Sequence, residues 1–431
     1  MTPINLQWFA FPVNVIIMLT LVFVAYLICI LPKIRKIYDW LTSNAAIMSA
    51  LLLLLAGCLV IGLVPQQRSG CVVTWWNRFY HSWYMALSVS YLFIVLIIRI
   101  IHFLQQKNWK ETAGNIVLHI GLLTILAGGY YGIPDEQTWR MDLSNIAFNN
   151  QTINTRTEQL QLFPYKLIIR KIEEDKYPSG KPRRITATLA IQDDVTMRNI
   201  EIQAGHPLRL KPYALHLRQY RHRDNIYLCT LLIVKHPWRL WIYIGMGLLL
   251  LGGLLMLKKK HYLTILVPAA IMAIIFFILK LLKPEMFHRE LVPSLQSIWF
   301  VPHVALYMLS FTILFIAFIF CLLWIFRKKE KLLQQSDDLI RAGMALFITA
   351  MLIGSIWAEV AWGHFWTWDL KETWALIACC TYFIYLYYRA IPSHKDSIAS
   401  LWHILAFITL QMCWYGVNYL PAASASMHIY H

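Results

Sequence analysis

Ten long apolar stretches constrain this chain more than any other feature of its sequence. A helix that crosses a bilayer needs about 20 largely apolar residues. Stretches close to that length lie at 10–31, 45–64, 84–104, 113–132, 237–257, 262–282, 300–326, 340–358, 373–389 and 398–418. Only 14% of all residues are charged, roughly half of the fraction in soluble proteins. The sequence therefore predicts an α-helical polytopic membrane protein with about ten transmembrane helices.

Basic clusters follow every second apolar stretch. They are Lys33-Ile34-Arg35-Lys36, Lys107 with Lys110, Lys258-Lys259-Lys260, Arg327-Lys328-Lys329, and Arg389 with Lys395. Such clusters stay on the cytoplasmic side, so every odd stretch is predicted to end inside and both termini to lie outside. The net charge of +17 (39 basic against 22 acidic residues) is thus interpreted as a topology signal, without nucleic acid as a partner.

One long polar segment, 133–236, separates the fourth and fifth stretches and is predicted to be external. Alternating runs at 165–170 and 185–191 indicate strands, and 177–182 reads as a turn. We therefore expect a small, mostly-β external domain. It divides the chain into helices 1–132, the domain 133–236, a fifth helix within 237–261, and a second helical region.

The cysteines argue against a redox or zinc motif. The chain has eight of them and contains no C-x-x-C pair, so neither a thiol-disulfide relay nor a zinc site has support. Most lie in apolar stretches, where cysteine behaves as a small hydrophobic residue. Cys71 and Cys229 alone lie near polar segments, and we do not expect a bridge between them.

A tryptophan-rich segment, 362–374, joins the eighth and ninth stretches and is predicted to be external. It reads W-G-H-F-W-T-W-D-L-K-E-T-W, with tryptophans at Trp362, Trp366, Trp368 and Trp374. Indole rings favour the headgroup region, but four in so short a polar segment exceed what an interfacial anchor needs. The pattern predicts a flat aromatic platform for a large planar ligand.

Several histidines are candidate ligands. His303 and His428 fall on the same external side as the tryptophans, although topology alone does not show that they converge. His119 lies in the middle of the fourth stretch, where an ionisable side chain is costly and marks a functional hypothesis. It either ligates haem iron or hydrogen-bonds to a neighbouring helix. His403 has a similar status, and His364 is either a ligand or an interfacial polar residue.

The stretch 357–377, with W-A-E-V-A-W-G-H-F-W-T-W-D-L-K-E-T-W-A-L-I, resembles the WWD signature of haem-handling proteins. More narrowly, 262–431 resembles the CcsA half of the System II cytochrome c synthetase, and Gly416-Val417-Asn418 followed by a terminal histidine also matches that half. The front of the chain resembles the CcsB (ResB) partner through the following segments: Val64-Pro65-Gln66, Phe79-Tyr80-His81-Ser82-Trp83, His119 through Gly128-Gly129, Gly205-His206-Pro207-Leu208 and Val234-Lys235-His236-Pro237.

A fused CcsBA-type resemblance implies a holocytochrome-c synthase of the bacterial plasma membrane, with the WWD segment on the periplasmic side. Such a protein exports haem b and attaches it through thioether bonds to the C-x-x-C-H motif of apocytochrome c. The resemblance implies that His303 and His428 are external axial ligands of the haem iron, and that His119 is a transmembrane ligand. It also implies that the tryptophans bind haem, with Lys371 or nearby arginines near its propionates.

The sequence departs from the family pattern at one position. The family usually carries a second transmembrane histidine after the WWD motif, whereas this chain has Tyr387 there, in Ile384-Tyr385-Leu386-Tyr387-Tyr388-Arg389. Three alternatives follow for the membrane site: ligation by Tyr387, substitution by His403, or a five-coordinate iron held by His119 alone.

His303 and His428 would act chiefly by positioning haem against the incoming thiols, and Asp369 is a candidate for assisting protonation, although an interfacial acid usually caps a helix. Because the chain lacks C-x-x-C, a separate thioredoxin-type reductant is expected to keep the thiols reduced. Three other functions compete: a haem exporter or delivery protein without ligation activity, a non-haem solute transporter whose tryptophans are a lipid anchor, and a quinone oxidoreductase with structural haem.

Overall fold

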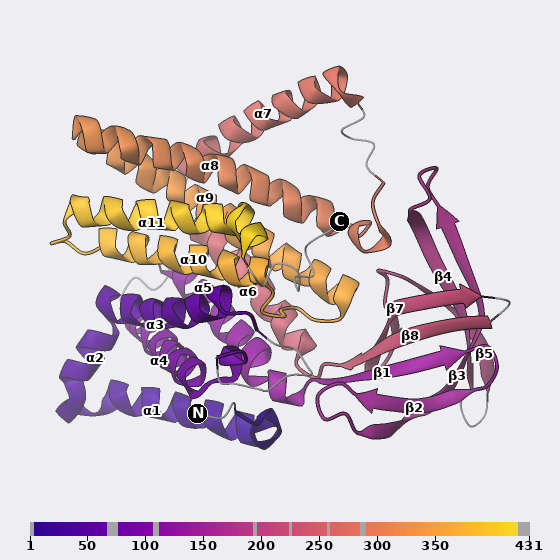
Figure 1. Ribbon diagram of the computed structural model, residues 1–431. Helices are drawn as coiled ribbons and strands as arrows, with labels where there is room; N and C mark the ends of the chain where they lie inside the picture. The colour runs from indigo at the N-terminus through magenta and orange to yellow at the C-terminus, as the bar shows by residue number, and fades with distance from the viewer. Residues whose placement is uncertain are drawn as a thin grey trace.

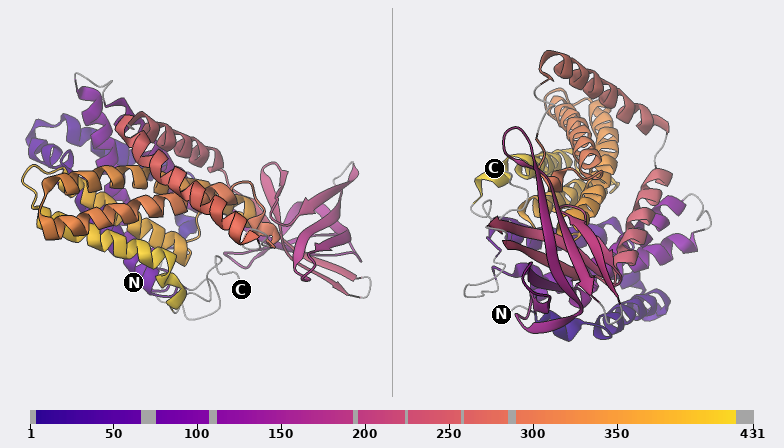
Figure 2. Two further views of the ribbon diagram at one scale, coloured as in Figure 1. Left: turned by 90° about the horizontal axis from the view of Figure 1, so that it is seen from above. Right: turned by 90° about the vertical axis from the view of Figure 1, so that its right-hand side faces the viewer.

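The computed structural model describes residues 4–66, 76–106, 112–192, 196–223, 226–256, 259–284 and 290–420. Long helices lie side by side in one part of the molecule, and an antiparallel sheet stands at one end of them (Figures 1 and 2). We call the helix ends beside the sheet the sheet-facing ends, and the opposite ends the far ends.

The front helices precede the sheet in the chain. They are α1 (Val13–Ile30), α2 (Arg35–Leu41), α3 (Asn44–Leu63), α4 (Trp83–Gln105) and α5 (Ala113–Leu126). A π-helical turn, Ala127–Tyr131, continues α5, so that the two together form one span. Ser43 and Ser82 cap α3 and α4, each accepting the backbone N–H three residues on, which explains why both helices begin where they do.

The back helices follow the sheet. They are α6 (Arg239–Met256), α7 (Lys259–Leu282), α8 (Phe300–Arg327), α9 (Glu330–Trp362), α10 (Leu370–Arg389) and α11 (Asp396–Trp414). Helices α8 to α11 pack together, whereas α7 lies at the edge of the group in Figure 1 and leaves most of its apolar side chains exposed.

Nine helices in the described residues are long and apolar enough to cross a membrane, as expected for a multi-pass membrane protein. They coincide with nine of the ten predicted stretches. Helix α9 runs over Glu330–Trp362 and is longer than the predicted 340–358. Its first turns are polar, so apolar residues alone do not predict them.

The tenth predicted stretch, 373–389, falls on α10, which is not among these nine. It is a helix of 20 residues that carries Lys371 and Glu372 in its first turn and Arg389 in its last. Helix α10 packs between α3 and α11 (Figure 1), so it joins the front helices to the back helices and exposes little of its surface.

The polar segment folds as an eight-stranded antiparallel sheet, which agrees with the predicted mostly-β character. Its strands are β1 (Gln137–Ser144), β2 (Asn149–Asn154), β3 (Leu160–Lys176), β4 (Pro182–Gln192), β5 (Met197–Gln203), β6 (Leu208–Leu210), β7 (Tyr213–Arg223) and β8 (Ile226–Lys235). Their order in the sheet is β5-β4-β3-β2-β1-β8-β7-β6. The predicted turn joins β3 to β4, with Gly180 at φ +85°.

The sheet is anchored at its centre. The sheet-facing end of the span that begins with α5 leads into β1, and β8 leads into α6. Strands β1 and β8 are neighbours in the sheet, paired from Gln137 opposite Lys235 to Ser144 opposite Leu228. One face of the sheet buries alternating apolar residues, such as Leu167 opposite Ile191. The sheet therefore has its own core, and two neighbouring connections, from α5 to β1 and from β8 to α6, join it to the helices.

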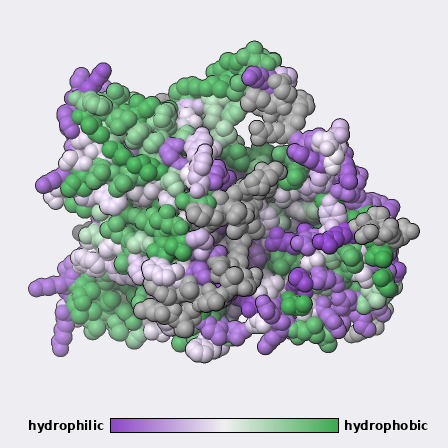
Figure 3. Space-filling view, viewed as in Figure 1, coloured by the Kyte–Doolittle hydropathy of each residue, from purple (hydrophilic) through white to green (hydrophobic). Residues whose placement is uncertain are grey.

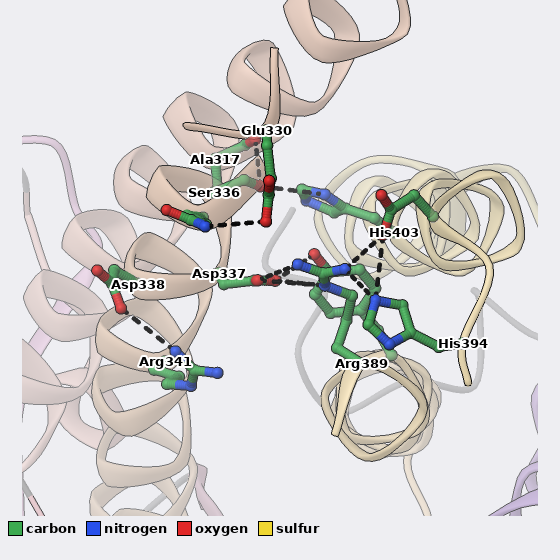
Figure 4. A network of polar contacts seen from close by, with 12 residues as sticks. Ala317, Glu330, Ser336, Asp337, Asp338, Arg341, Arg389, His394 and His403 are labelled. Carbon is green, nitrogen blue, oxygen red and sulfur yellow. Dashed lines mark hydrogen bonds and ion pairs between the residues drawn. The ribbon is translucent and has the colours of Figure 1, made fainter. Parts of the chain in front are cut away.

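Hydropathy separates the two parts of the molecule. Hydrophobic residues cover the helices on the face seen in Figure 3, and hydrophilic residues gather on the sheet and at the far ends. Polar residues also tie the far ends together. Asp337 of α9 accepts bonds from Tyr385 (2.5 Å) and Arg389 (Nη2, 2.8 Å) of α10, and Arg389 also pairs with Asp396 of α11 at 2.6 Å (Figure 4).

Small residues let α5 and α6 approach closely. A Cβ added at Gly252 of α6 would lie 2.4 Å from the backbone nitrogen of Leu118 on α5, and one at Gly121 of α5 would lie 2.5 Å from the nitrogen of Leu249. In a membrane such close backbone contact replaces the hydrophobic effect as the force between helices.

We predict that Gly252→Val destabilises the protein by about 1–3 kcal/mol, because the backbones must separate to admit the side chain. Gly253→Val is the matched control, since nothing lies within 4 Å of a Cβ built there. Thermal unfolding of both variants in detergent checks this, and equal melting temperatures for the two would contradict it.

Candidate functional site

The tryptophan loop, residues 363–369, joins α9 to α10 at the sheet-facing ends. Gly363 ends α9 with φ +86°, a conformation that glycine adopts without strain, and its N–H donates to Glu359 O at 2.9 Å. A Cβ here would lie 3.0 Å from Val234 Cγ2 and 3.2 Å from His216 Nε2, both on the sheet. The loop therefore begins in direct contact with the sheet.

A capping box fixes the other end of the loop. Asp369 is the buried N-cap of α10 and accepts the Lys371 N–H at 3.4 Å. The Glu372 carboxylate reaches back and accepts the N–H groups of Thr367 (2.8 Å) and Asp369 (3.1 Å). Asp369, predicted as a candidate proton donor, thus has a structural role in shaping the loop, while its catalytic role stays a prediction.

The predicted flat platform does not form, because the tryptophan rings point in different directions. Trp362 packs on Trp357 at 4.7 Å with the planes tilted by 58°. Trp366 and Trp368 meet edge to face, at 6.0 Å and 86°. Trp374 lies on α10 and donates its indole N–H to Gly62 O of α3 at 3.2 Å, so its ring packs between helices.

His303 lines a cavity of about 300 Å³, here called the His303 cavity. Helices α8, α9 and α10, the end of α11 and the tryptophan loop form its walls. Trp357 and Trp366 contribute aromatic surface to it, and Lys371 contributes a cation. The fold thus brings His303 close to part of the tryptophan segment. The sequence predicted only that the two lie on the same side of the membrane.

The orientation of His303 follows from its backbone contact. Its Nδ1 lies 2.8 Å from Ala350 O on α9. A carbonyl only accepts, so Nδ1 carries the proton and the lone pair is on Nε2, the nitrogen that would bind iron. Gly354 makes room for the ring, since a Cβ there would lie 2.3 Å from His303 Cε1. His428, the proposed second ligand, lies outside the described residues.

A second, larger cavity of about 490 Å³ lies beside the first and is here called the Glu136 cavity. Its walls come from α1, α4, the turn after α5, the sheet and the tryptophan loop. Trp366 lines both cavities, and its indole N–H is buried with no hydrogen-bond partner within the described part of the chain. This one ring therefore forms a wall that the two cavities share.

Charged and titratable groups gather in the Glu136 cavity. Glu136 is buried and contacts His364 of the loop (Oε1 to Nδ1, 2.6 Å) and His236 (3.7 Å). Burial would raise the pKa of Glu136, but the bond to His364, the charges of both histidines and Arg156 lower it to about 2. Glu136 is therefore ionised at neutral pH.

His81 lines the same cavity and lies just before α4, the third predicted stretch, which it was expected to orient. Burial, together with Arg156 and Arg78, lowers the pKa of His81 to about 4, so its ring is neutral at pH 7. Neither Glu136 nor His81 was predicted as a site residue. Their places follow from contacts between distant segments, for which the sequence carries no local signal.

A buried ion cluster holds the last turn of α9 near these cavities. Glu359 of α9 is 1% exposed and meets Arg239 of α6 at 3.0 Å and Arg209 of β6 at 3.3 Å. The Tyr243 hydroxyl donates to the same carboxylate at 3.2 Å. The sheet, α6 and α9 are therefore joined at a single carboxylate.

His119, the proposed transmembrane ligand, is buried on α5. Its Nδ1 lies 2.7 Å from Asn115 O, which again leaves the lone pair on Nε2. Its ring contacts Phe103 of α4, and Arg99 lies over Phe103 at 5.5 Å and over the ring of Tyr387 at 5.7 Å. The structure thus connects His119 to Tyr387 through two intervening side chains.

His403 belongs to a different group of contacts. It is fully buried on α11, with Nδ1 3.4 Å from the Ser336 hydroxyl and its ring against Tyr385 and Phe318. None of the contacts found in the described residues joins it to His119. The contacts of His403 thus differ from those that connect His119 to Tyr387, and which residue would be a second ligand stays a prediction.

The described residues contain no group of three or more histidine, cysteine or acidic side chains that would hold a bare metal ion. An iron already held by a porphyrin needs only one or two protein ligands, and single histidines such as His303 and His119 meet that requirement.

Comparison with known proteins places a resemblance in the same region. Residues 237–423 match the family model of the Cytochrome C assembly protein. Cytochrome c biogenesis protein CcsA of Chlamydomonas reinhardtii is 28% identical over 168 residues, which cover 36% of this chain and 48% of the relative. The CcsA protein of Guillardia theta is 29% identical over 185 residues, covering 36% and 62%.

A CcsA protein of Saccharum officinarum is 37% identical over 91 residues, which are 21% of this chain and 28% of that relative. The chain thus spans about half to three fifths of the length of the first two relatives that it matches. The C-terminal half of the chain is similar to CcsA-type cytochrome c assembly proteins.

We predict that His216 makes the stability of the sheet-facing region sensitive to acid. Burial, with Arg218, His364, Arg239 and Arg209 nearby, lowers its pKa to about 3, whereas an unfolded histidine titrates near 6.5. Below pH 6.5 the unfolded chain therefore binds a proton that the folded chain does not, so stability falls as pH falls.

His216→Gln should reduce the loss of stability between about pH 6.5 and about pH 5 by about 2 kcal/mol. Unfolding curves at several pH values measure this, with the exposed His206→Gln as control. An unchanged pH dependence in His216→Gln would contradict the prediction.

Proposed function

We propose that this protein attaches haem covalently to apocytochrome c on the side of the membrane where the sheet lies. The single observation that carries the proposal is the position of the His303 side chain. Its protonated Nδ1 is fixed on Ala350 O, and its side chain lines a cavity with Trp357, Trp366 and Lys371. That cavity lies within the region similar to cytochrome c assembly proteins.

Each of these groups suits one part of a haem molecule. The imidazole Nε2 of His303 would bind the iron, and the indole rings would pack against the porphyrin. Lys371 would pair with a propionate. By resemblance His428 would bind the iron from its other side, which would give a low-spin, bis-nitrogen site. The haem would be haem b, because it arrives without covalent bonds.

Attachment joins two cysteine thiols of the C-x-x-C-H motif to the two haem vinyl groups. The protein's contribution would be orientation, which can supply up to about 7–11 kcal/mol of a barrier. The histidine of the motif would replace one iron ligand and so align the thiols. A separate thioredoxin-type reductant would supply the thiols in reduced form.

The membrane orientation and the division of the chain belong to the same proposal. With the basic clusters on the cytoplasmic side, the sheet, the tryptophan loop and both termini would be periplasmic. The chain would then be a fused synthetase, with a CcsB-like part at 1–132 and 133–236, the fifth helix at 237–261, and a CcsA-like part at 262–431. Haem on its way through the membrane would meet His119 and Tyr387.

His303→Ala should abolish the bis-nitrogen absorption spectrum of the purified protein and reduce the covalent haem on a co-expressed apocytochrome at least about 10-fold. His206→Ala is the matched control, an exposed histidine of the sheet region that lines neither cavity. A protein that binds haem but never yields holocytochrome would indicate haem delivery without ligation. A colourless wild type would favour a transporter.

Gly354→Ala should weaken haem binding without touching a ligand, because its Cβ would push the His303 ring from Ala350 O. We expect a reduced haem content with His303 intact. Gly247→Ala is the control, since a Cβ there meets nothing within 4 Å. Equal haem content in the two variants would argue against His303 as the ligand in this orientation.

A further inference from the structure

The proposed function leaves one pair of side chains in the Glu136 cavity without a role. Glu136 stands between the turn Ile133–Asp135 and β1, and His364 follows Gly363 in the tryptophan loop. The two are 228 positions apart in the chain, and Oε1 of Glu136 lies 2.6 Å from Nδ1 of His364. A buried carboxylate at this distance orients an imidazole, as an aspartate does in hydrolases.

The protonation of the pair follows from its surroundings. Glu136 is ionised, so it accepts the Nδ1–H of His364, and the lone pair of the neutral imidazole is then on Nε2. The titratable and charged groups near the pair come from β7, from the segments next to the strands, and from the turn before α4. They are His236, His216, Arg218, Arg156 and His81.

The pair is close to the proposed haem site. His364 and Trp366 are two residues apart in the loop, both line the Glu136 cavity, and Trp366 also lines the His303 cavity. A peptide in the Glu136 cavity would therefore be next to a haem in the His303 cavity, because both cavities border Trp366.

We propose that His364 is the base that removes the proton from a cysteine thiol of the apocytochrome, and that Glu136 is the residue that positions it. The inference rests on the proposed function and names a group for its chemical step.

The step is balanced without an added oxidant or reductant. The S–H bond breaks, and its proton moves to His364 Nε2. The sulfur then forms a bond to the inner carbon of the haem vinyl group as the C=C π bond opens. The proton returns from the imidazolium to the outer vinyl carbon, forming a C–H bond. His364 is neutral again at the end, and one thioether has formed.

The two acids at the end of the loop are less suited to this step. Asp369 and Glu372 accept backbone N–H groups of the loop and of α10, and these bonds shape the loop itself. Removing a proton with either carboxylate would weaken the cap. The bond between His364 and Glu136, in contrast, uses only Nδ1 and directs the basic nitrogen elsewhere.

The decisive variant is His364→Gln, because a glutamine amide can still donate to Glu136 but is no base. Haem-loaded protein in detergent would be mixed with a reduced C-x-x-C-H peptide, and thioether formation followed by absorption. We expect unchanged haem content and melting temperature, and a rate at about pH 7 lower by about 10²-fold or more. Glu136→Gln should lower the rate less, and His206→Gln, the control, should have no effect.

Two further measurements separate a base from a structural residue. The defect of His364→Gln should shrink toward about pH 9, where a thiol with an ordinary pKa near 8.5 ionises without help. Added imidazole should partly restore His364→Ala, and this second variant also guards against misfolding of the first.

Wild-type rates in His364→Gln would overturn the inference, and so would a defect that is equal at all pH values. Loss of the haem spectrum in His364→Gln would instead make His364 an iron ligand. All of these outcomes leave haem attachment by the wild type intact, whereas a wild type that attaches no haem to the peptide would overturn the proposed function itself.

Discussion

A single buried carboxylate joins the sheet to two helices at the sheet-facing ends. Glu359, in the last turn of α9, accepts hydrogen bonds from Arg209 of the sheet and Tyr243 of α6, and forms an ion pair with Arg239 of α6. Removing one partner from a buried ion pair typically costs about 3–5 kcal/mol, because the other charge is left unpaired. The tryptophan loop begins four residues later, so its position relative to the sheet depends on this cluster.

The sequence predicted the helices and strands far better than the contacts between them. Apolar runs predicted nine helices long and apolar enough to cross a membrane, because a helix in lipid must be apolar along its length. The same logic missed the polar start of α9 and counted α10 as a tenth span, although α10 is not among the nine and meets protein on most sides. Alternation and a Pro-Gly turn identified the sheet, but not the strand order that puts β1 beside β8.

The site was predictable only in part, for a physical reason. The tryptophan spacing indicated an unusual loop. The directions of the rings, however, depend on the backbone of the loop, which has left-handed residues at Gly363 and Trp368 and ends in the capping box. In this backbone the rings of Trp366 and Trp368 are nearly perpendicular. The contact between Glu136 and His364 joins a segment that precedes the sheet in the chain to one that follows it by more than a hundred residues, so it has no local signature. Residues of the front helices, the sheet and the loop meet in one cavity, so neither half of the chain forms it alone.

The shared position of Trp366 has a consequence for the order of events. An occupant of the His303 cavity that moves the Trp366 side chain would change the shape of the Glu136 cavity and so its affinity for a second occupant. By thermodynamic linkage, the second occupant would change the affinity of the His303 cavity by the same factor. Binding in one cavity would thus affect binding in the other through one shared side chain. A ligand that widens the neighbouring cavity raises the affinity for the second occupant, a ligand that narrows it lowers that affinity, and in both cases the second occupant changes the affinity for the first by the same factor.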